Sequence, residues 1–235
     1  MKVFTLYYDR YKTATTSKAL HEANIDHYVM CHNNSKKFEN IYGEIVESNK
    51  PKGIQHNLNS CINLLEYNEW AIIMSDDYTE SYKIENKEFV KSNLAYVYNE
   101  LKRHTKIADQ IGVKLIGLNS SGNALYAQKN YGKYGLVDGR MFAIKKTEFK
   151  WLEDINCITD YYATVYHLNK YGGNLILQWC YADFKRYEKD GIGTAEARKE
   201  IKKNDIFILK NLYPKNIIIK DKKGQPKGTH IIIKK

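Results

Sequence analysis

Short apolar runs alternate with segments of helical spacing along the first third of the chain, and this alternation constrains the fold more than any other feature. Val3–Tyr8, Asp26–Cys31 and Trp70–Met74 are short runs of strand-forming residues. A Thr/Ser-rich helix start follows the first run, and Asn57–Tyr67 has apolar residues at helical spacing. A polar loop, His32–Gly53, precedes that helix. The order strand–helix–strand–loop–helix–strand predicts an α/β sandwich with a mainly parallel sheet.

The rest of the chain continues this alternation. Further helices are predicted at Lys91–Ile111, Ile158–Lys170 and Asp205–Asn211, further strands at Val113–Leu118, Arg140–Lys145 and Leu175–Trp179, and a terminal hairpin at Ile217–Lys220 and Thr229–Lys234. Ser120–Gly135 is expected to be a polar loop. Because no internal repeat and no linker divides the chain, we expect a single domain over residues 1–235.

Positive charge is concentrated at the C-terminal end. Lys and Arg outnumber Asp and Glu by 37 to 27, and residues 199–235 contain eleven Lys against three acidic residues. A basic face of this kind favours a polyanionic partner, most often nucleic acid, through counterion release. The other interpretation is a solvated segment that only keeps the protein soluble.

Cysteine usage and the lack of long apolar runs bear on the compartment. The four cysteines include no C-x-x-C pair, so they predict neither a zinc site nor a disulfide framework. The N-terminus has the pattern of a strand and not of a signal peptide, and no apolar run approaches the length of a membrane span. We therefore expect a soluble, cytoplasmic protein with no membrane partner.

Two adjacent aspartates, Asp76 and Asp77, follow the apolar strand Trp70–Met74. Functional groups in parallel sheets gather beyond the carboxyl ends of the strands. Adjacent carboxylates repel each other unless a cation lies beside them, and Mg²⁺ or Mn²⁺ prefers such oxygen ligands and can bridge to nucleotide phosphates. Alternatively, D-D-Y-T merely opens a turn or caps a helix.

Polar residues after the first strand are candidates for contacts with the base, ribose and phosphates of a nucleotide. Helix N-termini attract phosphate, and an arginine there adds positive charge. Thr15 or Thr16 could instead simply cap the helix. The candidates are Asp9, Arg10, Thr13 and Thr16.

The segment G-I-Q-H-N-L-N-S-C-I-N-L-L-E-Y-N-E-W-A-I-I-M-S-D-D-Y is similar to nucleotide-sugar glycosyltransferases of the GT-A type, in which a helix leads into an apolar strand that ends in a D-x-D metal motif. Three later segments resemble the phage TET-associated DNA glycosyltransferases: I-T-D-Y-Y-A-T-V-Y-H-L-N-K-Y-G-G, D-G-I-G-T-A-E-A-R and L-K-N-L-Y-P. The resemblance touches most of the chain. It implies a GT-A-like three-layer α/β/α sandwich with a basic C-terminal hairpin, in which residues 1–118 bind the nucleotide-sugar and residues 119–235 bind the acceptor.

The resemblance also assigns roles to single residues. Asp77 matches the last carboxylate of D-x-D, the usual metal ligand, and Asp160 matches the acidic position that serves as general base. Ser75 stands where the first aspartate is expected; this departure weakens metal dependence or moves the nucleotide-sugar contacts onto Asp76. A helix N-cap is the alternative for Asp160. The H-N pair, His56 and Asn57, and Arg198 after the Gly-rich loop would complete the donor site.

Aromatic and basic residues alternate in the Ser120–Gly135 loop, a pattern that suits stacking on bases and contacts with phosphates. Scattered surface tyrosines in a chain with 20 tyrosines are the alternative. The candidate nucleic-acid contacts are Tyr131, Lys133, Lys202, Lys203, Lys222 and Lys223.

The resulting hypothesis is a metal-dependent glycosyltransferase in the cytosol of a phage-infected bacterium. It would move a sugar from a nucleotide-sugar, expected to be a UDP-sugar, to the hydroxymethyl group of 5-hydroxymethylcytosine in double-stranded phage DNA. Mn²⁺ or Mg²⁺ would be the cofactor. One alternative changes the acceptor to a protein or polysaccharide. Another is a non-catalytic nucleic-acid-binding module on the same fold, which the Ser75 departure makes conceivable.

Overall fold

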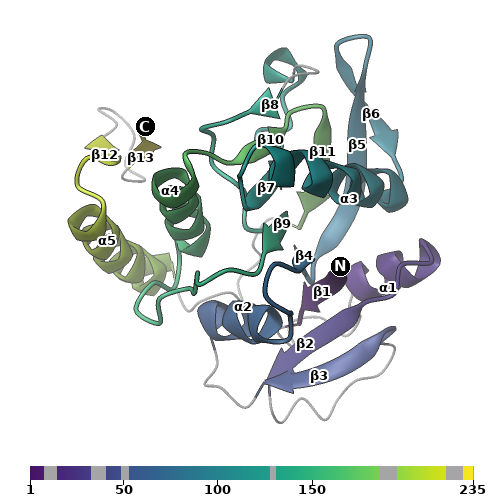
Figure 1. Cartoon of the computed structure of the whole chain (residues 1–235), viewed down its shortest axis with the longest axis horizontal. Coiled ribbons are helices and arrows are strands. Elements are labelled where there is room, and N and C mark those ends of the chain that lie inside the picture. The colour runs from purple at the N-terminus through teal and green to yellow at the C-terminus, as the bar shows by residue number, and fades with distance from the viewer. Residues whose placement is uncertain are drawn as a thin grey trace.

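A computed structural model describes residues 1–7, 15–32, 41–48, 53–127, 131–185, 195–220 and 230–234 (Figure 1). Its centre is an eight-stranded sheet with the order β3-β2-β1-β4-β9-β7-β10-β8, in which β9 and β8 run antiparallel to their neighbours. The mainly parallel sheet predicted from the sequence is therefore confirmed. The strands are β1 (Lys2–Leu6), β2 (Tyr28–His32), β3 (Glu44–Ser48), β4 (Trp70–Ser75), β7 (Leu115–Leu118), β8 (Tyr131–Gly132), β9 (Met141–Lys145) and β10 (Leu175–Leu177).

Helices cover both faces of this sheet, because its central strands are apolar on both sides. Leu6 and Ile73 face a core shared with α2 (Ile54–Asn63) and α4 (Thr159–Tyr171). Ile72 faces the opposite core, which contains α1 (Thr15–Glu22) and α3 (Leu94–Gln110). The expected three-layer α/β/α arrangement is present (Figure 1).

A second, three-stranded sheet with the order β11-β5-β6 was not predicted. β5 (Tyr78–Glu85) and β6 (Glu88–Ser92) form a hairpin, and β11 (Cys180–Phe184) pairs with β5. The hairpin turn consists of Asn86 and Lys87, both with positive φ, as a type I′ turn requires. The turn lacks the usual glycine, which is why the sequence pattern did not reveal it.

The C-terminal region packs on the α2 and α4 side of the main sheet. α5 (Ala195–Leu212) has 18 residues, so the prediction of a short helix at 205–211 was wrong in length. The predicted hairpin is confirmed as β12 (Ile217–Lys220) and β13 (His230–Ile233). Ile206 and Leu209 of α5 and Ile217 of β12 belong to the same core as α2 and α4.

Three further features bear on the sequence predictions. β3 lies inside the segment predicted to be a polar loop. The sequence did not reveal this strand, because it is a largely exposed edge strand without an alternating apolar and polar pattern. All four cysteines are free thiols. None of the helices in the described ranges has the length and apolar character needed to cross a membrane.

Candidate functional site

The carboxyl ends of the parallel strands β1, β4, β7 and β10 lie at one edge of the main sheet, where α1, α2 and α4 begin. This edge is where ligands bind in open α/β sheets. The chain returns to the same edge at the start of β9, because β9 runs antiparallel between β4 and β7. The described candidates Thr16, His56, Asn57, Asp76, Asp77 and Asp160 all come from segments that start or end there.

The Asp76–Asp77 turn is tied to the first residues of α1. The Thr16 hydroxyl donates to the Ser75 carbonyl oxygen (2.6 Å) and accepts a hydrogen bond from the Tyr78 N–H (3.0 Å). The Thr15 hydroxyl donates to the Asp76 carbonyl oxygen (3.0 Å). Because the fully buried Thr16 hydroxyl is committed to this turn, its observed role is to position the aspartates.

The two carboxylates differ in their surroundings. Asp76 is buried, with 2% of its surface exposed, and has polar contacts of its own. Asp77 is half-buried, and its enclosed Oδ1 atom has no hydrogen-bond partner among the residues that the structure describes. Burying a carboxylate oxygen without a partner costs free energy unless a ligand satisfies it.

A divalent cation fits this orphaned oxygen, since hard cations prefer carboxylate oxygens. In the described part of the chain, no group of three or more His, Cys, Asp or Glu side chains has the geometry to hold a metal ion. Asp76 and Asp77 would therefore supply two protein ligands, and water or phosphate oxygens would supply the others, as is usual for Mg²⁺.

Asp160 lies in the first turn of α4, where its Oδ1 accepts the Tyr161 N–H (2.9 Å). It lines an apolar cavity of about 10 Å³, room for roughly one water molecule, together with Gly139 and Trp151. Burial and then the negative charge of Asp138 raise the pKa of Asp160 to about 7. At neutral pH the carboxyl group is therefore poised to accept or release a proton.

Asp160 is not at the N-cap position of α4, although its carboxylate accepts the N–H of Tyr161 in the first helical turn. Ile158 occupies the cap position and makes no side-chain cap hydrogen bond. The segment that leads into α4 is held by α5: Asp205 Oδ2 accepts the backbone N–H groups of Asn156 (3.0 Å), Cys157 (2.5 Å) and Ile158 (3.3 Å). The Asp160 carboxylate itself interacts with backbone N–H groups, among them those of Tyr161 and Gly139.

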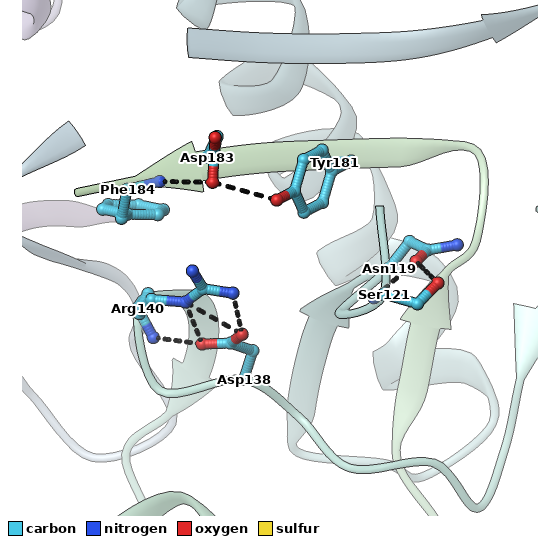
Figure 2. A network of polar contacts seen from close by, with 7 residues as sticks. All are labelled: Asn119, Ser121, Asp138, Arg140, Tyr181, Asp183 and Phe184. Carbon is cyan, nitrogen blue, oxygen red and sulfur yellow. Dashed lines mark hydrogen bonds and ion pairs between the residues drawn. The ribbon is translucent and has the colours of Figure 1, made fainter. Parts of the chain in front are cut away.

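A polar network at the start of β9 was missed by the sequence reasoning (Figure 2). Asp138 accepts hydrogen bonds from the backbone N–H of Arg140 and from Nε and Nη2 of its guanidinium. Across from this pair, Asp183 Oδ1 accepts the Tyr181 hydroxyl (2.9 Å) and the Phe184 N–H (3.0 Å). The only signal in the sequence was a D-G-R turn before a strand, which is too common to indicate a site.

The first turn of α2 holds His56 and Asn57. His56 Nδ1 lies 3.8 Å from Glu153 Oε1. Asn57 is fully buried, and within the described ranges neither Oδ1 nor Nδ2 of its side-chain amide has a hydrogen-bond partner. An amide in this state has the donor and acceptor that would match the polar edge of a nucleobase.

The remaining candidates are distributed over other elements. Arg198 is half-buried on α5, and its charge acts on Cys157. The Tyr131 hydroxyl contacts His104 Nε2 (3.1 Å), and Lys133 is exposed next to β8. Lys202 and Lys203 are exposed on α5, which lies apart from β8 (Figure 1). The candidates Asp9, Arg10, Thr13, Lys222 and Lys223 lie outside the described residues.

Comparisons with known proteins found similar solved structures but no matching family or curated sequence. No protein-family model and no curated protein sequence matches the chain. HddC from Yersinia pseudotuberculosis is similar in structure, with a TM-score of 0.41 and 11% identity over 86% of this chain and 98% of HddC. The same protein in complex with GMP-PN gives a TM-score of 0.39 and 10% identity over 88% and 100% of the two chains.

CMP:2-keto-3-deoxy-manno-octonic acid synthetase in complex with CTP gives a TM-score of 0.41 and 9% identity, over 86% of this chain and 96% of the synthetase. Likenesses this distant establish neither a family nor an activity. The resemblance to DNA glycosyltransferases therefore stays a prediction, and the function has to be argued from the site.

Proposed function

We propose that the chain is a glycosyltransferase that uses a nucleotide-sugar, with a UDP-sugar as the expected donor. The observation that carries the proposal is the orphaned Asp77 oxygen beyond the carboxyl end of β4, at the same sheet edge as Asp160. The Asp77 oxygen supplies a site for the cation of a sugar nucleotide, and Asp160 supplies a base for the acceptor hydroxyl. The segment that contains Gly139 and Arg140 connects the two, since the Arg140 carbonyl accepts the Ser75 N–H and Gly139 packs on Asp160.

On the donor side, Asp76 and Asp77 would hold Mg²⁺ or Mn²⁺. A divalent cation held there would supply positive charge that offsets the negative charge of a departing diphosphate. Thr15 and Thr16 keep the two carboxylates in place through their hydrogen bonds to the turn. Asn57 would pair with the base of the nucleotide, which would satisfy its unpartnered amide.

On the acceptor side, Asp160 takes the proton of the attacking hydroxyl group. The acceptor oxygen forms a bond to the anomeric carbon, the bond from that carbon to the diphosphate oxygen breaks, and the nucleoside diphosphate leaves. A carboxyl group with a pKa of about 7 is suited to this step, because a useful fraction is ionised at neutral pH and the group is a stronger base than an ordinary aspartate.

The proposed acceptor is the hydroxymethyl group of 5-hydroxymethylcytosine in phage DNA. Lys202 and Lys203 are exposed on α5, and an exposed phenylalanine, Phe207, follows them on the same helix. Lysines contact phosphates, and an aromatic ring offers a stacking surface for a base. The described lysines of α5 therefore support a nucleic-acid acceptor over an uncharged polysaccharide.

The donor site is tested by thermal denaturation with UDP and several UDP-sugars, each with and without Mn²⁺. A ligand at about a hundred times its dissociation constant adds roughly 2.7 kcal/mol of stability. We expect stabilisation that needs both nucleotide and metal and that is lost in Asp77→Ala. Stabilisation that persists unchanged in Asp77→Ala would contradict the assignment of the turn.

The acceptor is tested by transfer of a labelled sugar to DNA that contains 5-hydroxymethylcytosine, with unmodified DNA as control. In DNA-binding titrations, Lys202→Gln and Lys203→Gln should each lower the slope of log affinity against log salt by about 1. Lys106→Gln, an exposed lysine on α3, is the matched control and should leave the slope unchanged. Transfer to protein or polysaccharide but not DNA would move the acceptor to the alternative class. Tight DNA binding with no nucleotide response would indicate the binding module.

A further inference from the structure

Arg140 occupies a special place at the carboxyl edge of the sheet. Its carbonyl oxygen accepts the Ser75 N–H (2.8 Å), so its backbone lies beside the residue that precedes Asp76. Its guanidinium lies over the ring of Phe184 in the small sheet, 5.7 Å from the ring centroid. The side chain therefore stands where the main sheet, the small sheet and the aspartate turn meet.

The guanidinium is held rigidly from one side. Nε lies 2.9 and 3.0 Å from the two Asp138 oxygens, and Nη2 donates to Oδ2. The Arg140 backbone N–H also donates to Oδ1 of Asp138 (2.9 Å), which couples side chain and main chain. The neighbouring Val137 N–H donates to the Thr164 hydroxyl (3.1 Å), and so the segment is anchored to α4.

The second terminal nitrogen, Nη1, is not engaged by Asp138 and points away from it, toward β11 (Figure 2). Within the described residues, no hydrogen bond joins Nη1 to a protein group. Asp183, the carboxylate on that side, receives hydrogen bonds from its own strand through Tyr181 and Phe184. A third of the Arg140 side chain is exposed to solvent.

An anionic ligand at the carboxyl edge of the sheet needs a positively charged side chain such as Arg140. Asp76, Asp77, Asp138 and Asp160 bring several carboxylates to one region, which would repel an anionic ligand. A preorganised guanidinium is the side chain best matched to phosphate oxygens. Arg140 also follows directly after a residue that contacts the proposed base, Asp160. Gly139 packs against Asp160, and a Cβ at position 139 would lie 3.2 Å from Asp160 Cβ.

We propose that Arg140 binds a phosphate group of the nucleoside diphosphate through Nη1, beside the Asp76–Asp77 turn. This assignment rests on the proposed function for the identity of the nucleotide, but the phosphate contact itself is independent of any sugar or acceptor. Arg140 is then a substrate-binding residue that stabilises the departing diphosphate together with the cation at the aspartates.

The experiment measures binding of inorganic pyrophosphate, UDP and uridine to the full-length chain by calorimetry at a fixed Mg²⁺ concentration. Losing a charge-assisted hydrogen bond should weaken pyrophosphate and UDP binding about tenfold or more in Arg140→Gln, and leave uridine binding unchanged. Arg103→Gln is the matched control, because Arg103 pairs with Glu100 on the exposed side of α3. Arg140→Lys keeps the charge but loses the planar fork, and an intermediate loss is expected.

The outcomes separate the two proposals. Wild-type affinity for pyrophosphate in a folded Arg140→Gln or Arg140→Lys variant would overturn the role of Arg140 and leave the nucleotide-dependent function standing. Binding of pyrophosphate without UDP, lost in Arg140→Gln, would support the Arg140 site and count against a nucleotide-sugar donor. A wild-type chain that binds neither pyrophosphate nor UDP would overturn both.

Discussion

At the scale of single residues, Asn57 shows how function and stability can oppose each other. Its amide is fully buried and has no hydrogen-bond partner in the described part of the chain, although an unsatisfied buried polar group costs about 1–3 kcal/mol. A residue selected for stability alone at this position of α2 would be apolar. The unpartnered amide therefore supports a role in ligand binding.

Asn57→Leu is expected to raise the free energy of unfolding by about 1 kcal/mol, because it replaces an unsatisfied amide with an apolar group of similar size. The same substitution should weaken stabilisation by UDP. Urea denaturation and thermal shift with UDP measure the two effects. A less stable variant with normal UDP binding would show that Asn57 is a packing residue.

Asp160 makes a pH-dependent contribution whose sign follows from its environment. Its pKa is raised from 3.8 to about 7, with burial as the main cause and Asp138 as the second. Between these two values the folded protein holds a proton that the unfolded chain has released, so this group's contribution to stability falls as pH rises from about 4 to about 7. Besides Asp138, the titratable neighbour is Tyr161, whose pKa is raised by burial and by Asp160.

Asp160→Asn should therefore gain stability relative to the wild type as pH rises through this window, by an amount on the order of 2–4 kcal/mol. Urea denaturation at pH 4.5, 6 and 8 measures the difference. Transfer activity in the wild type should rise with pH through about 7 and be lost in the variant. A stability difference that stays constant with pH would mean that Asp160 titrates normally.

At the scale of elements, α5 is part of the site's scaffold and more than a basic appendage. Asp205 of α5 holds the segment that leads into α4, because one of its carboxylate oxygens accepts three backbone N–H groups there. α4 carries Asp160 in its first turn, so the position of the proposed base depends on a residue 45 positions later in the chain.

Asp205→Ala is expected to lower the free energy of unfolding by about 2–4 kcal/mol, since three backbone N–H groups that are buried or half-buried lose their acceptor. Asp205→Asn keeps an acceptor oxygen and should lose less. Comparing the two by chemical denaturation separates the hydrogen-bonding role from loss of the side chain. Equal stabilities of Asp205→Ala and the wild type would show that these hydrogen bonds are dispensable.

The elements also show where local patterns succeed and fail. Trp70–Ser75 and Thr159–Tyr171 were predictable, because a fully apolar run and a 3.6-residue period with a Gly172 C-cap are local signals. β5, β6 and β11 were not, because their strands are partly exposed and are stabilised by pairing with one another. The length of α5 was underestimated because its lysine-rich first half has no apolar stripe.

At the scale of the whole molecule, the basic C-terminal region is integrated into the core. Ile206, Leu209, Ile217 and Ile231 are buried in the same core as α2 and α4. Burying each such side chain contributes roughly 1.5–3 kcal/mol, and their sum is comparable with the total stability of a typical domain. The region cannot be treated as a detachable DNA-binding tail.

Deletion of residues 199–235 is therefore expected to abolish cooperative unfolding, which circular dichroism during thermal denaturation would show. The point variants Lys202→Gln and Lys203→Gln should retain the wild-type melting temperature within a few degrees, because both side chains are exposed. A truncated chain with a sharp, unchanged transition would contradict this account of the core.

By itself, the sequence determined the alternation of strands and helices, the mainly parallel sheet and the position of Asp76 and Asp77 beyond a central strand. These features follow from periodicity and from the rule that places ligands at the carboxyl ends of parallel strands. Only the tertiary structure decided that Thr16 holds the aspartate turn, that Asp205 holds the segment before α4, and that Arg140 lies beside Ser75 with Nη1 directed away from Asp138. Each of these contacts joins residues far apart in the chain or depends on the direction of a side chain. Long-range contacts and side-chain directions cannot be predicted from local residue spacing, because burial and hydrogen bonding are set only when the layers pack.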